Sequence, residues 1–173
     1  MDQITTIEDA IIARLIALLQ TQGLSAAALP YPDKDFEKYE PLHNNGEILV
    51  AYVSEDDGPP EALDIVVQER ELFFELTFVF NSLRSVGKVG GLYAHLEAVR
   101  MKLTGFKPEG CTKKTTMAGV DRVKRYKSRW WQYTQVFKFT ALNVEDYQEE
   151  EGTLLNRITI NSGDRSTDVI SEL

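Results

Sequence analysis

The start of the chain repeats large apolar residues every three or four positions, with polar residues between them. The apolar positions with this spacing are Ile4, Ile7, Ile11, Leu15 and Leu18. The spacing predicts an amphipathic helix over Ile7 to Gln22. Thr6 is placed to cap its N-terminus, and Gly23 can supply the left-handed residue that ends it. Glu8 and Asp9 favour the positive N-terminal end of such a helix.

A second stretch with helical spacing lies in the middle of the chain. Its apolar positions are Leu92, Leu96, Val99 and Leu103. They predict a helix over residues 92–103 that ends at Gly105. The preceding residues 82–91 contain three glycines and are predicted to be a connection.

Two other stretches alternate large apolar and polar residues, which is the period of a β-strand with one buried face. In Leu72 to Phe80 every even position is large and apolar, while Glu75 and Thr77 lie on the opposite face. Trp131 to Ala141 alternates in the same way, with Gln135 as the one polar interruption on the apolar face. Each stretch is predicted to be a strand with one face in the core.

The remaining apolar stretches are shorter. Ile48 to Val53 is apolar on both faces, which predicts a central strand covered on both sides. Ala26 to Leu29 is predicted to be a short strand, and Asp33 to Asn45 a loop. The acids and turn formers of Glu55 to Pro60 indicate a hairpin tip, after which Ile65 to Glu69 resumes as extended chain.

Two segments lack a clear core pattern. Residues 106–128 are polar and basic, and a connection of that length is functional or contains weakly signalled strands, such as a hairpin arm. Beyond Val144 the chain is acidic, although Leu154, Ile158 and Ile160 could add a short segment to a neighbour. The sequence therefore predicts one α+β domain over residues 1–144. It consists of a small, mainly antiparallel sheet of about four strands packed with two helices, followed by a flexible, acidic extension over residues 145–173 that could bind a partner.

Composition narrows the class of protein. The chain has 173 residues, which fits one domain able to bury a core without disulfides or metal. No basic leader is present, and no apolar run approaches the roughly 20 residues that span a bilayer, so no membrane segment is expected. Cys111 is the one cysteine, which fits a reducing cytoplasm and predicts a buried or incidental thiol.

Charge is distributed unevenly along the chain. The net charge is −8, yet residues 113–129 carry seven bases against the single acid Asp121, a local charge of +6, and the rest of the chain carries −14. The bases are Lys113, Lys114, Arg122, Lys124, Arg125, Lys127 and Arg129. A basic segment on an acidic body offers an electrostatic contact for an acidic partner.

The chain offers few residues for catalysis. Its two histidines are His43, in a turn-rich loop, and His95, one position before the core residue Leu96. Neither belongs to a nucleophile and base motif, and His95 is predicted to lie at the surface or boundary of its helix. We expect no enzymatic activity and no cofactor.

Two further motifs are candidate ligand sites. The acids Glu55, Asp56, Asp57 and Glu61 lack the alternating oxygen ligands of a calcium loop and are predicted to be a solvated loop tip, so no metal is expected. Residues 87–91 place a lysine between glycines before a helix, but they do not form a phosphate-binding P-loop.

The basic segment is also the best candidate for binding nucleic acid. Lysine and arginine hold phosphates, and the nearby Tyr126, Trp130 and Trp131 could stack on bases. However, Trp131 belongs to the alternating core pattern and the rest of the chain is strongly negative, which repels DNA. A protein partner is therefore favoured, and nucleic-acid binding is the alternative.

Several segments, taken in order, resemble a known family. They are residues 7–11 (IEDAI), 46–52 (GEILVAY), 68–70 (QER), 91–93 (GLY), 99–100 (VR), 103–106 (LTGF) and 131–133 (WQY). Over residues 7–142 the chain resembles the minor tail proteins of Mu-like phages and prophages, which are related to tail-terminator or tail-completion proteins. The basic segment before Trp130 and the acidic chain after Val144 depart from that pattern.

The resemblance implies a structural role without chemistry. It implies an α+β subunit that assembles with copies of itself, typically six, into a ring at the head-proximal end of a phage tail or of a contractile injection system. Such a ring ends the tail tube, caps the sheath and joins a head-completion or cap protein, in particles assembled in the bacterial cytoplasm. The seven bases listed above are the predicted contacts to the tube, the sheath or the next subunit. A third hypothesis, an enzyme whose site is formed between subunits, would require a perturbed histidine or carboxylate in the cleft.

Overall fold

The computed structural model describes residues 2–32, 36–60, 66–84, 90–121, 124–127, 129–144, 158–162 and 165–169. In the order of the chain the elements are α1 (Gln3–Gln22), β1 (Ala27–Pro30), a short 3-10 helix η1 (Phe36–Lys38), β2 (Gly46–Asp57), β3 (Val67–Phe80), α2 (Leu92–Leu103), β4 (Thr116–Val120), β5 (Lys124–Tyr126), β6 (Trp130–Val144), β7 (Ile158–Ser162) and β8 (Arg165–Val169).

Helix α1 confirms the predicted apolar stripe but begins four residues earlier than predicted. Its N-cap is Asp2, whose carboxylate accepts hydrogen bonds from the Thr5 backbone N–H and hydroxyl, both at 2.8 Å. The predicted cap Thr6 instead lies inside the first turn, where its hydroxyl donates to the Asp2 carbonyl. Aspartate is as good an N-cap as threonine, so the earlier start satisfies the helix end equally well. Gly23 ends the helix at φ 62°, as predicted.

The main sheet is mixed and has six strands in the order β1-β2-β3-β6-β4, with β5 also paired to β6. β1 runs parallel to β2, and the other pairs are antiparallel. The predicted α+β class with two helices agrees with this arrangement. The sheet exceeds the predicted four strands because the basic segment contributes β4 and β5.

The β2–β3 hairpin is longer than predicted. Glu55 to Asp57 lie on β2, where they pair with Leu72 to Arg70 of β3, so these acids are not part of a loop tip. The side chain of Arg70 pairs with Glu55 across the two strands. This ion pair gives the acidic end of β2 a partner that the hydropathy pattern alone does not reveal.

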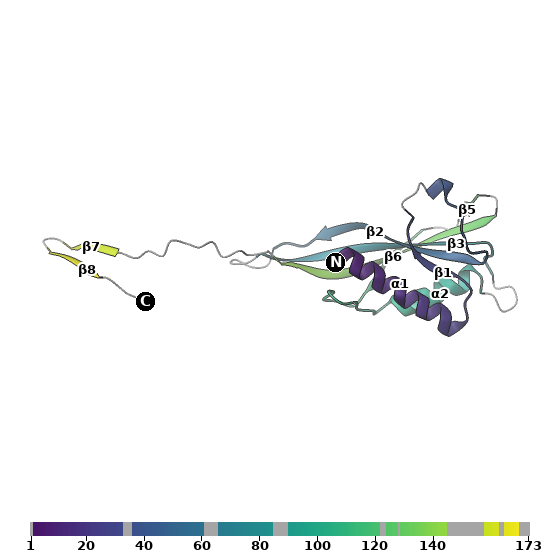
Figure 1. Ribbon diagram of the computed structural model, residues 1–173, viewed down its shortest axis with the longest axis horizontal. Helices are drawn as coiled ribbons and strands as arrows, with labels where there is room; N and C mark the ends of the chain where they lie inside the picture. The colour runs from purple at the N-terminus through teal and green to yellow at the C-terminus, as the bar shows by residue number, and fades with distance from the viewer. Residues whose placement is uncertain are drawn as a thin grey trace.

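Both helices cover one face of the sheet, and the main core lies between that face and the helices (Figure 1). On that face β3 and β6 place large side chains opposite one another, as in the pairs Phe74↔Phe137 and Leu72↔Phe139. Phe74 and Phe139 meet edge to face with ring centroids 5.4 Å apart. All five predicted core positions of β3 are fully buried, which confirms the alternation read from the sequence.

Two polar residues are enclosed by this core. Gln135 is 3% exposed, and its amide donates to the Leu96 carbonyl at 3.3 Å. His95 is fully buried against the Phe80 ring, at 4.5 Å between ring centroids, so the prediction of a surface or boundary position is wrong. The reason is that the connection before α2 lies directly against the imidazole ring: a Cβ on Gly90 would lie 3.2 Å from His95 Cε1. Burial lowers the pKa of His95, against the opposing effect of its contact with the Gly91 carbonyl.

The other face of the sheet has no α-helix over it among the described residues, and only the short 3-10 helix η1 packs on one end of it. One end of this face carries a second cluster, in which Leu49, Val79, Tyr126 and Trp130 are buried; we call it the aromatic cluster. Tyr31, Phe36 and Tyr39 pack over them from the loop before β2. Figure 1 shows η1, which contains Phe36, on the side of the sheet opposite α1 and α2.

In the C-terminal segment, β7 and β8 form a separate antiparallel pair. Ile158 and Ile160, which by their sequence could add a short segment to a neighbour, pair here with Val169 and Thr167. Leu154 and the acidic run over residues 145–151 lie outside the described residues. The predicted boundary between residues 144 and 145 stays a prediction.

Phe74→Ala should destabilise the fold strongly, because it removes a fully buried ring that contacts Tyr52 and Phe139. We expect the free energy of unfolding, measured by urea denaturation at neutral pH, to fall by about 3–5 kcal/mol. The matched control is Met101→Ala on α2, whose side chain is 73% exposed and should cost less than about 0.5 kcal/mol. Equal losses in both variants would contradict the assigned core.

Candidate assembly surface

The basic segment is built into the sheet as its outer edge. β4 and β5 do not pair with each other; both pair with β6, so the segment completes the sheet and the predicted hairpin arm does not form. Thr116 lies opposite Lys138, and Tyr126 lies opposite Trp130. Those two positions of β6 are eight residues apart, or about 26 Å at about 3.3 Å per residue.

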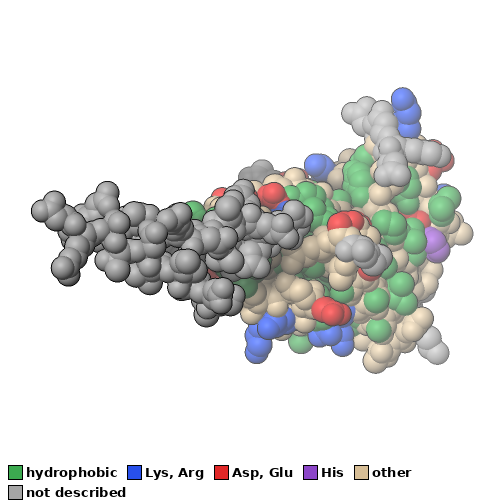
Figure 2. Space-filling view, turned by 60° about the vertical axis from the view of Figure 1, so that its left-hand side comes forward, with side chains coloured by type: hydrophobic (Ala, Val, Ile, Leu, Met, Phe, Trp, Pro, Cys, Tyr) green, Lys and Arg blue, Asp and Glu red, His purple; other side chains and the backbone are tan. Residues whose placement is uncertain are grey.

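The predicted contact residues are therefore spread along an edge and do not form one patch. Lys113 and Lys114 precede β4, Lys124 and Arg125 lie on β5, and Lys127 and Arg129 follow it. Arg122 lies outside the described residues. We call the strand β4 together with Lys113, Lys114, Lys124 and Arg125 the basic edge. On the face drawn in Figure 2, Lys and Arg side chains lie at separate places around the rim.

Charges within the basic edge are only partly neutralised. Lys113 pairs with Glu69 at 2.7 Å, and Lys124 pairs with Asp121 at 3.4 Å. Both pairs are exposed, so each contributes little to stability and can exchange partners. The Arg125 guanidinium lies 4.2 Å from the Trp131 ring centroid. Lys114 is exposed and has no ion-pair partner within the described part of the chain.

The other end of the segment holds the aromatic cluster in place. Lys127 donates to the Tyr39 carbonyl at 2.9 Å, and Arg129 lies 5.4 Å from the Trp130 ring. The Tyr126 hydroxyl lies between the carbonyl oxygens of Phe36 and Tyr39, at 2.5 and 2.6 Å. Tyr126 and Trp130 are only 9% and 7% exposed, so they are not available to stack on nucleic-acid bases. This burial removes part of the basis for the nucleic-acid alternative.

A buried carboxylate, Glu47 at the start of β2, fixes the loop that carries the aromatic cluster. Its oxygens accept hydrogen bonds from the Tyr39 hydroxyl (2.5 Å), the Leu42 N–H (2.7 Å), the His43 N–H (2.9 Å) and His43 Nδ1 (2.9 Å). Burial raises the pKa of Glu47, but these hydrogen bonds outweigh it and the net pKa is lowered. In the sequence this site is marked only by an acid beside the apolar run of β2, and the hydropathy pattern does not identify its partners.

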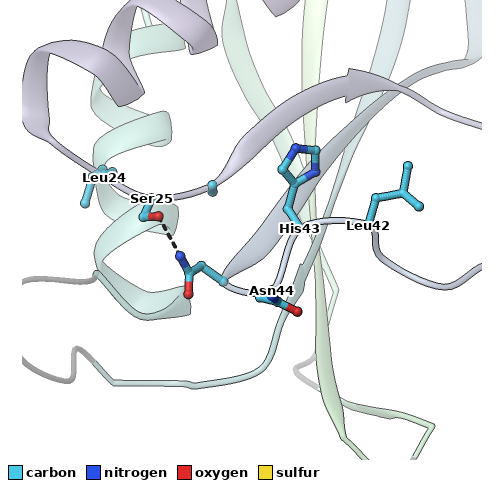
Figure 3. Close-up of a pocket in the computed structure, with 7 residues that line it drawn as sticks. Leu24, Ser25, Leu42, His43 and Asn44 are labelled. Carbon is cyan, nitrogen blue, oxygen red and sulfur yellow. Dashed lines mark hydrogen bonds between the residues drawn. The ribbon is translucent and has the colours of Figure 1, made fainter.

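A shallow groove lies beside this loop, lined by Leu24, Ser25, Ala26, Leu42, His43, Asn44 and Asn45 (Figure 3). The Ser25 hydroxyl oxygen accepts a hydrogen bond from the Asn45 amide at 2.6 Å, drawn as the dashed line. His43 directs Nδ1 at Glu47. Within the described residues no hydrogen bond joins Ser25 to His43, so the groove does not assemble a nucleophile and base pair.

The other candidate groups have structural surroundings. Cys111 is 6% exposed, and burial raises the pKa of its thiol to about 11, in agreement with the predicted buried thiol. No cluster of three or more potential metal ligands occurs in the described ranges, and the predicted loop acid Glu61 and residues 85–89 lie outside them. No described helix has both the length and the apolar character to cross a membrane.

Comparisons with known proteins give one family match. A family model described as Gp37 protein matches residues 11–162. No curated protein matches the chain. Among solved structures, a chain of the "Virion of native gene transfer agent (GTA) particle" aligns with 14% identity and a TM-score of 0.43, over 83% of this chain and 100% of that chain. A likeness of this degree establishes neither a shared fold nor a shared role.

Glu47→Gln should make stability less dependent on pH in the acidic range. A lowered folded-state pKa means that the carboxylate stabilises the fold fully above its ordinary value of 4.5, and that this contribution is lost as the pH falls through the lower folded value. We expect the variant to lose about 1–3 kcal/mol at neutral pH, with the difference from wild type shrinking below about pH 4.5. Urea unfolding over a pH series measures this.

The control for this experiment is Glu97→Gln, which removes an exposed carboxylate from α2. It should leave the pH dependence of unfolding close to that of the wild type. If the two variants show the same profile, Glu47 does not hold the loop as described.

Proposed function

We propose that this chain, which belongs to the Gp37 protein family, is a structural subunit of a phage tail or phage-like contractile injection system. In this proposal copies of the chain form a ring, typically of six, that ends the tail tube and caps the sheath. Its partners are other copies, tube and sheath proteins, and a head-completion or cap protein. The particle would be assembled in the bacterial cytoplasm.

Two lines of support come from sequence. The Gp37 family is phage-related, and its model matches residues 11–162. Independently, the ordered segments between residues 7 and 142 resemble tail-terminator proteins. Both apply to nearly the same part of the chain, which contains the main sheet and both helices.

The observation that carries the proposal is the unequal covering of the sheet. Helices cover one face, whereas the middle of the other face has no helix over it in the described structure and includes half-buried Phe73 and Val136 with the 47% exposed Val53. The basic edge adds a second, chemically different surface. A closed ring needs contacts between different surfaces of neighbouring subunits, and the uncovered face and the basic edge are the two surfaces that we propose take part in them.

The contact residues remain part of the proposal, divided by what each already does. Lys113, Lys114, Arg122, Lys124 and Arg125 are the proposed contacts to the tube, the sheath or the next subunit. Lys127 and Arg129 also support the aromatic cluster, so their replacement would affect folding as well as assembly.

The purified chain should form closed rings, alone or on the ends of tail tubes. Light scattering after size exclusion gives the mass of the assembly, and electron microscopy of tubes with added chain shows whether a ring lies at the tube end. We expect tube length to stop increasing once the ring is bound. Monomers alone, even with tubes present, would rule the proposal out.

A titration with duplex DNA tests the alternative function. Phosphate contacts would give binding that weakens by about a thousandfold or more between about 50 and 200 mM salt. We expect weak binding with no such salt dependence, because the body is acidic and Tyr126 and Trp130 are buried. Tight, steeply salt-dependent binding would favour the alternative.

A further inference from the structure

The basic edge is an open strand edge as well as a charged one. β4 is the last strand in the order of the sheet, and its only strand partner within the described residues is β6. Thr116, Ala118 and Val120 are exposed along it, Val120 by 58%. Edge strands present unpaired N–H and C=O groups that can pair with another chain.

The C-terminal segment has the opposite charge. Residues 145–173 contain eight acids and two bases, a net charge of −6, and five of the acids fall within residues 145–151. Residues 113–129 carry +6. Charges of equal size and opposite sign on two separate segments favour their association and set its orientation.

The same segment contains two strands that are not part of the six-stranded sheet. β7 and β8 pair only with each other among the described strands. A two-stranded hairpin is marginally stable by itself in water, so it gains stability by docking on a further strand or surface.

On this basis we propose that the acidic segment over residues 145–173 docks on the basic edge of a second copy. The proposal rests on the ring described above and names the contact between its subunits. The 13 residues between β6 and β7 can span at most about 45 Å, which allows β7 and β8 to lie well away from the end of β6. Exchange of such a segment from each subunit to the next produces the head-to-tail contact that a ring requires.

The test uses a chain that ends at Val144 and a fluorescent peptide of residues 145–173. Both core clusters lie between residues 7 and 141, so the shortened chain keeps all of its core. We expect the peptide to bind the shortened chain in fluorescence anisotropy, and binding to weaken about tenfold when salt is raised from about 50 to about 300 mM. The shortened chain should also lose self-assembly in light scattering.

Charge reversal locates the contact. Lys114→Glu with Lys124→Glu should weaken peptide binding about tenfold or more. The matched control, Arg84→Glu with Arg100→Glu, makes the same charge change at two exposed positions outside the basic edge and should leave binding within about twofold. Circular dichroism and urea unfolding check that both double variants are folded.

The outcomes separate this inference from the proposed function. If the shortened chain forms rings as the full chain does and the peptide fails to bind, the inference is wrong and the ring stands. If the peptide binds the shortened chain while the full chain stays monomeric and does not bind it, the segment occupies its own edge, which overturns docking between copies. If both double variants weaken binding equally, the peptide responds to the overall charge of the chain and not to the basic edge, and the inference fails.

Discussion

The whole structure depends on the pairing of β3 with β6. Fourteen residue pairs fix the register of these two strands, and that register decides which side chains meet on the helix-covered face. A shift of β6 by one residue against β3 would turn Phe137 away from the helices and direct Val136 toward them. The helices, the hairpin with β2 and the outer edge formed by β4 and β5 all attach to this central pair.

Much of this arrangement can be predicted from the sequence, because an element that buries one face has apolar residues at regular intervals. The strands around Phe74 and Phe137 and both helices follow directly from periods of two and of three to four residues. The strand β4 could not be predicted in this way. Edge strands have little buried surface, so Thr116 to Val120 carry no strong alternation, and their pairing is set by the partner strand β6.

Buried polar groups were the least predictable part of the molecule. The position of His95 depends on how closely the glycine-containing connection approaches its helix, which periodicity does not encode. Glu47 gathers its hydrogen-bond donors from a loop with no regular pattern. Charge alone marks the basic segment in the sequence. It does not show that Lys127 donates a hydrogen bond to the Tyr39 carbonyl while Lys114 is exposed.

The length of the β3–β6 pair has a mechanical consequence. A pull directed along these strands would load their hydrogen bonds in shear, so many must break together, whereas a pull across them would open the pairs one after another. The chain leaves this pair at Val144, the end of β6. A pull on Val144 directed along β6 would therefore load the β3–β6 pair in shear.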